Sequence, residues 1–295
     1  MFVDNNWYGQ RSILSRYCNI KDSHVFAAIQ HGMLTRSQEE LLGKRRFSNI
    51  PYLCWNKRVF EKLKSKNLKN IHVIGSPFLY LHELESQKAI KYNQKGTIVF
   101  PSKSTYEKKR DINFPLLIER TEKIFPGPYT VSIYHADLKK DLSIFHKKNW
   151  KIVSFGKRSD SNFLHKNYKE ILKNENVVCT SINTVFFYAS YLRKNIKFIF
   201  SGNLENIVLT PDENQARTQK FYESKYPGIL NNELTIDQLY KIAYFELGAD
   251  YLKSKNDLIK LLGQDSKIKI LLSYLISKYM DLKHYIIWKK SLRND

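Results

Sequence analysis

The chain contains few cysteines, and they lie far apart. Among its 295 residues there are three, Cys18, Cys54 and Cys179, and no two of them form a C-x-x-C pair. Such spacing argues against a disulfide framework and against a structural zinc site. It is typical of a protein that stays in a reducing compartment.

Acidic residues are also scarce. The sequence has 28 Asp and Glu against 49 Lys and Arg, which gives a net charge of +21. A field of this sign favours polyanionic partners, meaning nucleic acid, an anionic membrane or a phosphorylated substrate. The lysines are spread along the whole chain, so a general enrichment in lysine explains the same charge, and both explanations stay open.

Long hydrophobic segments are missing. No uncharged apolar run reaches the roughly 18 residues that a membrane-spanning helix needs, and residues 1–6 are polar, without the apolar region of a signal peptide. Hydrophobic residues nevertheless make up 42% of the chain, which is enough for a packed core. We therefore expect a folded cytoplasmic protein, attached at most peripherally to the inner membrane.

Residues 1–92 are expected to form a short α/β domain. Its predicted elements are a strand at 25–29, a helix at 58–66 and a strand at 71–74. The first strand ends in Gln30-His31-Gly32, and the turn signal Gly75-Ser76-Pro77 follows the last one. Residues 85–96 are polar and lack a β pattern, so they form the predicted linker.

Residues 93–263 are expected to form a second, larger α/β domain. Four consecutive strand-then-helix units run from 97 to 200, and a fifth strand completes the series. The predicted strands are 97–100, 131–134, 151–155, 177–179 and 196–200, and the predicted helices are 114–125, 138–148, 162–174 and 184–194. This alternation predicts a five-stranded parallel sheet with helices on both faces.

Polar and basic residues follow the strands of this second domain. They are Ser102, Ser104, Thr105, His135, Gly156, Lys157, Arg158, Ser181, Asn183 and Thr184. A parallel sheet brings all of its strand ends to one edge, where open α/β sheets bind ligands. Hydroxyls, cations and a helix N-terminus at one edge suit a phosphate-bearing ligand. The alternative for each residue is an ordinary loop or helix-capping role.

After Gly202 the pattern predicts only helices. Thr235-Ile236-Asp237-Gln238 has the form of a capping box, and a second helix is expected near 256–262. Residues 264–295 are expected to form an amphipathic basic helix, with apolar residues at helical spacing and many lysines. Such a helix either packs against the protein's own core or attaches the chain to an anionic membrane surface.

Four segments together resemble a known group of enzymes. They are Gln30-His31-Gly32, Ile74-Gly75-Ser76-Pro77, Val99-Phe100-Pro101-Ser102 and the stretch from Thr180 to Tyr191. In this order they resemble bacterial GT-B glycosyltransferases of surface and capsular polysaccharide synthesis. The closest likeness is to sialyltransferases, polysialyltransferases and Kdo transferases, with a more distant one to glycerophosphotransferases.

The resemblance implies a GT-B-like fold of two Rossmann-like domains and an inverting reaction that needs no metal. In these families a His-Pro pair after the second strand of the donor domain contacts the cytidine nucleotide. Here Tyr134-His135-Ala136 keeps the histidine and lacks the proline. The sequence also shows no D-x-D pair on a loop of the kind that holds a metal, so neither a metal nor another cofactor is expected.

The resulting expectation is a glycosyltransferase that moves an acidic sugar from a CMP donor to a glycan or glycolipid acceptor. His31 is expected to be the catalytic base, with Asp4, Glu39 and Glu40 as further candidates, and the polar strand ends of the second domain are expected to bind the donor. The alternatives are a different donor, such as a UDP-sugar or CDP-glycerol, and a basic nucleic-acid-binding protein. Against the last, the basic residues form no stripe and no known binding motif is present.

Overall fold

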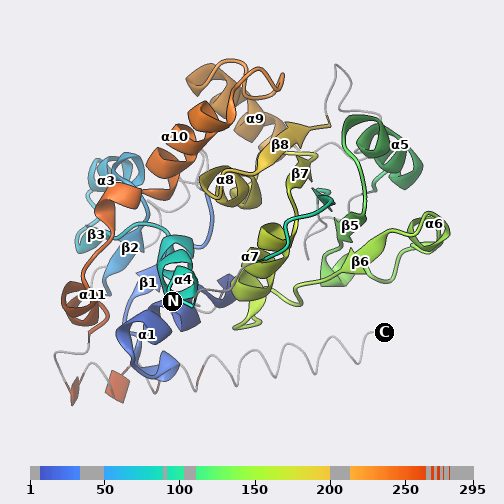
Figure 1. Cartoon of the computed structure of the whole chain (residues 1–295). Helices are drawn as coiled ribbons and strands as arrows, with labels where there is room; N and C mark the ends of the chain where they lie inside the picture. Colours follow the sequence, from blue (N-terminus) through green and yellow to red (C-terminus); the bar gives the residue numbers. More distant parts are fainter. Residues whose placement is uncertain are drawn as a thin grey trace.

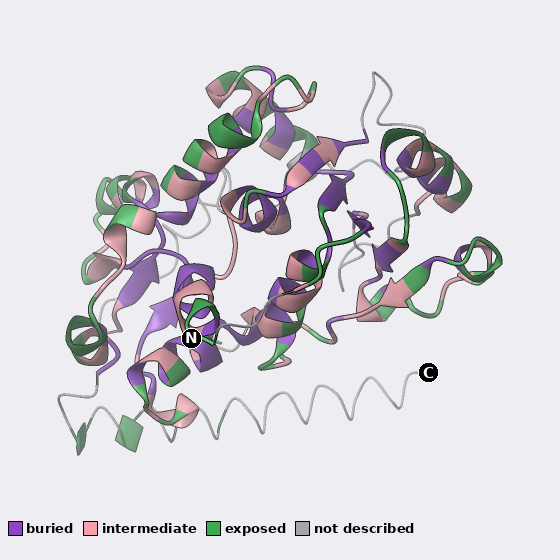
Figure 2. Cartoon of the chain, in the orientation of Figure 1, coloured by how far each residue is buried: buried purple, intermediate pink, exposed green. Residues whose placement is uncertain are grey.

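The fold consists of two parallel β-sheets with helices packed around them (Figure 1). The computed structural model describes residues 7–33, 50–88, 92–102, 111–199 and 213–263, together with helical positions 267, 268, 271, 272, 275 and 279. Most strands of both sheets are largely buried, whereas no residue of the edge strands β3 and β6 is buried (Figure 2). The prediction of an α/β fold with two parallel sheets is confirmed.

The first sheet has three short parallel strands in the order β1-β2-β3. They are β1 (Ala28–Ile29), β2 (Tyr52–Cys54) and β3 (Ile71–Val73). The helices of this part are α1 (Gln10–Cys18), α3 (Lys57–Lys64) and α4 (Pro77–Ser86). Strands β1 and β3 and helix α3 confirm the prediction, whereas β2, α1 and α4 were not predicted.

The second sheet has five parallel strands in the order β6-β5-β4-β7-β8. They are β4 (Thr97–Phe100), β5 (Tyr129–Ser132), β6 (Lys151–Val153), β7 (Asn176–Cys179) and β8 (Asn195–Phe198). All five predicted strands are present. Strand β5 begins two residues earlier than predicted, although the ladder continues to Ile133, whose N–H donates to the Val153 carbonyl.

Helices connect the strands of the second sheet as predicted, with one clear difference. They are α5 (Phe114–Ile124), α6 (Ser143–Lys147), α7 (Phe163–Lys173) and α8 (Thr184–Tyr191). Helix α6 is much shorter than the predicted 138–148, because residues 138–142, which follow the 3-10 turn η3 (His135–Asp137), are not helical. In addition, the Asp141 carboxylate accepts the Ser143 N–H at 2.9 Å and so begins the helix at that point.

The chain after the second sheet returns to the first sheet. It forms α9 (Glu213–Lys225), α10 (Ile236–Leu247), η5 (Ala249–Tyr251) and α11 (Lys255–Leu261). The capping box at Thr235 and Gln238 is confirmed. Helix α10 packs on α8, while α11 packs on α1, so this segment contacts both sheets.

The segment between the two sheets differs from its prediction. The turn signal Gly75-Ser76-Pro77 is the start of α4, with the Ser76 hydroxyl accepting the Phe78 N–H at 3.3 Å. The predicted linker 85–96 therefore begins inside a helix. Its first residue, Glu85, is buried and forms ion pairs with Lys88 and Arg16 at 2.6 and 3.4 Å, and the His165 Nε2 lies 3.2 Å from the same carboxylate. Pairing of this kind ties α4 to α7 and α1.

The largest hydrophobic cluster spans both sheets and the C-terminal helices. Its members include Trp55, Phe78, Phe187, Tyr222 and Leu247, all completely buried. The proposed boundary between residues 1–92 and 93–263 remains a prediction.

The C-terminal segment 264–295 lies mostly outside the described residues. Its described apolar side chains, Ile268, Leu271, Leu272, Leu275 and Tyr279, are between 43% and 71% exposed. Among the residues that the structure describes, no helix has the length and hydrophobicity to cross a bilayer.

Candidate functional site

The chain reverses its direction of travel across the second sheet between β4 and β7. From β4 it proceeds to β5 and β6 on one side, whereas β7 and β8 lie on the other side. The loops that leave the carboxyl ends of β4 and β7 therefore diverge. In open α/β sheets such a switch point forms the crevice in which ligands bind.

Buried hydroxyl groups join the carboxyl ends of β4 and β7. The Thr180 hydroxyl accepts the Ser102 N–H at 2.8 Å and lies 3.1 Å from the Ser102 hydroxyl. The Ser102 hydroxyl in turn donates to that of Ser181 at 3.3 Å. All three residues are buried. Two residues of the predicted donor site, Ser102 and Ser181, are thus in direct contact. Thr180, which is not among the residues predicted to bind the donor, lies beside both of them.

Helix α8 begins at the same switch point. The Asn183 side chain accepts the Phe186 N–H at 3.1 Å, so Asn183 is the N-cap, as its sequence position allowed. The remaining amides of the first turn and the positive end of the helix dipole favour an anion there. This places Asn183 and Thr184 beside the Ser102–Ser181 pair in the chain and in the fold.

The carboxyl end of β1 in the first sheet meets this helix end. The Thr184 hydroxyl accepts the Met33 N–H at 3.2 Å, and a methyl group added to Gly32 would lie 3.4 Å from the same oxygen. The loop that carries His31 therefore faces the switch point of the second sheet. Residues that are more than 150 positions apart come together here.

The side chain of Gln30 fixes the shape of this loop. Its Nε2 donates to the Gly32 carbonyl at 2.8 Å, and its Oε1 accepts the Trp55 N–H at 3.0 Å. Gln30 is buried, so both interactions are shielded from water. The side chain thereby ties the His31 loop to the end of β2 and holds His31 at the sheet edge.

An aromatic bridge connects His31 with the far end of the second sheet. The Trp7 ring lies 4.4 Å from the His31 ring, and the Arg158 guanidinium lies 4.0 Å above Trp7. The Arg158 carbonyl also accepts the N–H of Tyr8. Sequence reasoning chose His31 and Arg158 separately and missed Trp7, which no motif marks.

The remaining predicted residues of the second domain lie at the same edge but farther from the switch point. His135 is the first residue of η3, which follows β5 after Ile133 and Tyr134, and its ring is edge-on to that of Tyr134 at 4.4 Å. Gly156 has φ +89°, and a Cβ there would lie 2.7 Å from an Asp160 carboxylate oxygen, so this turn needs glycine. Lys157 is exposed after β6, the edge strand.

Several predicted residues cannot be placed. Asp4, Glu39, Glu40, Ser104 and Thr105 lie outside the described residues. Within the described ranges, no group of three or more His, Cys, Asp or Glu side chains is arranged to hold a metal ion.

Comparisons with solved structures find chains that are similar to this one. No family model matches the chain, and no curated protein matches it. A crystal structure of TarM matches with 14% identity and a TM-score of 0.36, over 85% of this chain and 53% of that one. A variant of S. aureus TarM in complex with fondaparinux, alpha-GlcNAc-glycerol and UDP matches with 14% identity and a TM-score of 0.37, over 80% and 49%. The chain spans about half the length of these structures, and similarity at this level does not define a shared function.

Proposed function

We propose that the protein is a glycosyltransferase that takes a sugar from a nucleotide-activated donor. The observation that carries this proposal is the contact between two carboxyl edges. The switch point of the five-stranded sheet, at Ser102, Thr180 and Ser181, faces the His31 loop of the three-stranded sheet through the Met33–Thr184 hydrogen bond. A transferase needs this combination of an anion-binding crevice and an opposing polar loop.

The donor's phosphate would bind at the second sheet. The first-turn amides of α8 and the hydroxyls of Ser102 and Ser181 supply hydrogen-bond donors for phosphate oxygens. His135, which follows the neighbouring strand β5 after Ile133 and Tyr134, would contact the nucleoside. These fixed dipoles would also stabilise the negative charge that the departing nucleotide gains.

The acceptor would approach from the first sheet. Its hydroxyl oxygen forms a bond to the anomeric carbon while the bond between that carbon and the phosphate oxygen breaks. His31 would take the hydroxyl proton, since histidine ordinarily titrates near neutral pH. The contact with Trp7 limits the rotation of the His31 ring, and Gln30 holds its backbone. Attack from the face opposite the leaving group inverts the anomeric centre.

The donor class follows from the sequence resemblance. It favours a CMP-linked acidic sugar, of the sialic acid kind, with a glycan or glycolipid of bacterial surface polysaccharide as acceptor. A UDP-sugar or CDP-glycerol donor is the alternative that keeps the same site. The second candidate function is nucleic-acid binding, favoured by the net charge of +21.

A thermal-shift panel of CMP, CDP, UDP, GDP, ADP and a short RNA tests this proposal. A ligand present at about 100 times its dissociation constant adds roughly 2.7 kcal/mol to the free energy of unfolding. We expect CMP to raise the melting temperature most. A response to UDP or GDP instead would change the donor and keep the enzyme class. No response to any mononucleotide, with salt-sensitive stabilisation by RNA, would refute the transferase.

A further inference from the structure

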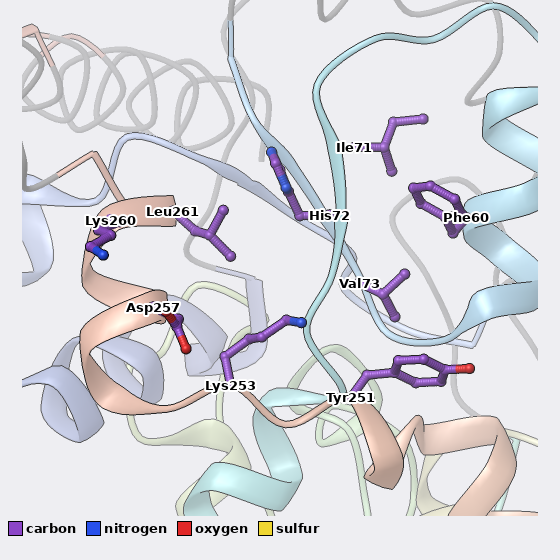
Figure 3. A pocket seen from close by; sticks show the side chains of 9 residues that line it. All are labelled: Phe60, Ile71, His72, Val73, Tyr251, Lys253, Asp257, Lys260 and Leu261. Carbon is purple, nitrogen blue, oxygen red and sulfur yellow. The ribbon is translucent and has the colours of Figure 1, made fainter.

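A groove lies along the free edge of the first sheet, on the strand farthest from His31. Its volume is about 570 Å³, and it is formed by β3, α3 and the segment from η5 to α11. Figure 3 shows that it has two unlike sides. A space of this size holds one or two sugar rings.

One side of the groove is apolar and aromatic. Phe60, Ile71 and Val73 lie together on this side of β3, and Tyr251 lies at their end (Figure 3). All four side chains are only partly buried, and the Lys64 ammonium lies over one face of the Phe60 ring, 5.8 Å from its centre. Rings and aliphatic chains of this kind pack on the C–H face of a sugar ring.

The other side carries positive charge. His72, Leu261 and Lys260 lie there, and the Lys253 side chain extends toward the strand between the two sides (Figure 3). Within the described part of the chain, neither the Lys253 nor the Lys260 ammonium group has an ion-pair partner. An unpaired cation beside apolar surface is a binding point for an anionic group.

The one acidic residue in the lining does not cancel this charge. Asp257 accepts a hydrogen bond from the Ser254 hydroxyl at 2.7 Å and belongs to the first turn of α11. With two lysines and one aspartate the lining has a net charge of +1 when His72 is neutral. Burial, and then the nearby Lys253 ammonium, lower the pKa of His72. An anion bound beside Lys253 would therefore raise the pKa of His72.

We propose that this groove binds an acidic saccharide unit, with its ring against Phe60 and Tyr251 and its carboxylate or phosphate between Lys253 and Lys260. The inference rests on the proposed function, because it makes the groove a second contact for the acceptor. It lies on the sheet that carries His31, separated from β1 by β2 alone. An oligosaccharide acceptor held there would present another of its sugar units to the His31 loop.

Binding of tetragalacturonate by isothermal titration calorimetry tests the groove directly. The experiment uses the whole protein at about 0.15 M salt, which screens nonspecific attraction to a basic surface. Maltotetraose serves as the neutral probe and inorganic phosphate as the bare anion. The double variant Lys253→Met/Lys260→Met is compared with Lys255→Met/Lys66→Met, which removes the same charge from exposed positions outside the groove.

We expect the groove variant to bind tetragalacturonate about tenfold more weakly, from two partly exposed ion pairs. The control variant should bind like the wild type. The imidazole resonance of His72, assigned with a His72→Gln variant, should move on binding, and its pKa should rise. Equal loss in both double variants, no binding, or equally tight binding of maltotetraose or phosphate would overturn the proposal. The calorimetric assay contains no nucleotide, so the two proposals can fail separately. If no nucleotide of the thermal-shift panel stabilises the protein but tetragalacturonate binds in the groove, the transferase is refuted and the saccharide site is supported.

Discussion

The two sheets of this protein share parallel strands but differ in the order in which the chain adds them. In the first sheet β1, β2 and β3 follow one another without reversal, whereas the second sheet reverses between β4 and β7. Only the reversal makes loops diverge and opens a crevice. In the proposed function the second sheet would therefore bind a phosphate at its own edge, while the first would contribute a single loop, around His31, from the opposite side.

The sheets also differ in what stabilises them. Helices α5, α7 and α8 of the second sheet are its own crossover connections. The returning C-terminal segment packs on α8 of the second sheet, and beside each of the three strands of the first sheet it forms hydrogen bonds. Asn56 donates to the Glu246 carbonyl at 2.7 Å, and the N–H groups of Ser76 and Phe26 donate to the carbonyls of Leu247 and Leu262 at 2.8 and 3.0 Å. The part of the molecule that is predicted to supply the catalytic base is thus built from distant segments.

The largest effect should come from the first sheet's contribution to the chemistry. We expect His31→Ala to lower kcat by about 100-fold to 10,000-fold, the usual range for loss of a general base. Nucleotide affinity should stay within about twofold, because the proposed phosphate site is at the other sheet. Steady-state kinetics with the donor identified by the panel, together with calorimetric titration of the nucleotide, measure both quantities.

His135→Ala is the matched change in the second sheet. It should weaken nucleotide binding, since His135 follows β5 on the donor edge. If His31→Ala weakened nucleotide binding while His135→Ala reduced only kcat, the roles assigned to the two sheets would be reversed.

A smaller effect, on stability, should follow from loosening the returning segment. The completely buried Glu246 carboxylate of α10 pairs with Lys225 at 2.6 Å and Arg58 at 3.3 Å and accepts the Tyr226 hydroxyl at 2.9 Å. Glu246→Gln leaves two cations without their counter-charge, so we expect a loss of about 3 kcal/mol in the free energy of unfolding. Urea denaturation measures this loss. Hydrogen exchange should show faster opening of β2 and β3 than of β4 and β7.

Glu119→Gln provides the control for this prediction. Glu119 pairs with Lys123 at 2.6 Å on the exposed surface of α5, so its loss should leave the free energy of unfolding nearly unchanged. Equal protection loss in both sheets after Glu246→Gln would show that the first sheet has no special dependence on α10.

Much of the second sheet could be predicted because buried parallel strands appear as continuous apolar runs. Val177, Val178 and Cys179 are an example, followed by a helix with its own cap. Strand β2 was missed because Tyr52–Cys54 is only three residues long and its pairing depends on both neighbours. Helix α4 was missed because Pro77 was interpreted as part of a turn, although proline also suits the first turn of a helix.

Only some residues of the candidate site could be predicted from the sequence. Residues at strand ends, such as Ser102 and Ser181, follow from the topology of a parallel sheet. Trp7 could not be found in this way, since it reaches His31 and Arg158 only through the tertiary path of the N-terminal segment. Thr180 belongs to the segment 180–191 that carries the family resemblance. Its role, however, depends on the hydrogen bond from the Ser102 N–H, which joins the ends of two strands.

The smallest effect tests the buried hydroxyls of the switch point. Thr180→Val keeps the shape of the side chain but removes the hydroxyl that accepts the Ser102 N–H. The backbone at Ser102, after β4, should therefore shift. We expect nucleotide affinity to fall about fivefold to tenfold, with kcat at saturating donor nearly unchanged. Thr121→Val is the matched control, because Thr121 is equally buried and its hydroxyl donates to the Leu117 carbonyl within α5, away from the crevice. Wild-type affinity in Thr180→Val, or an equal loss in Thr121→Val, would place the nucleotide elsewhere and remove the difference between the two sheets on which the proposed mechanism depends.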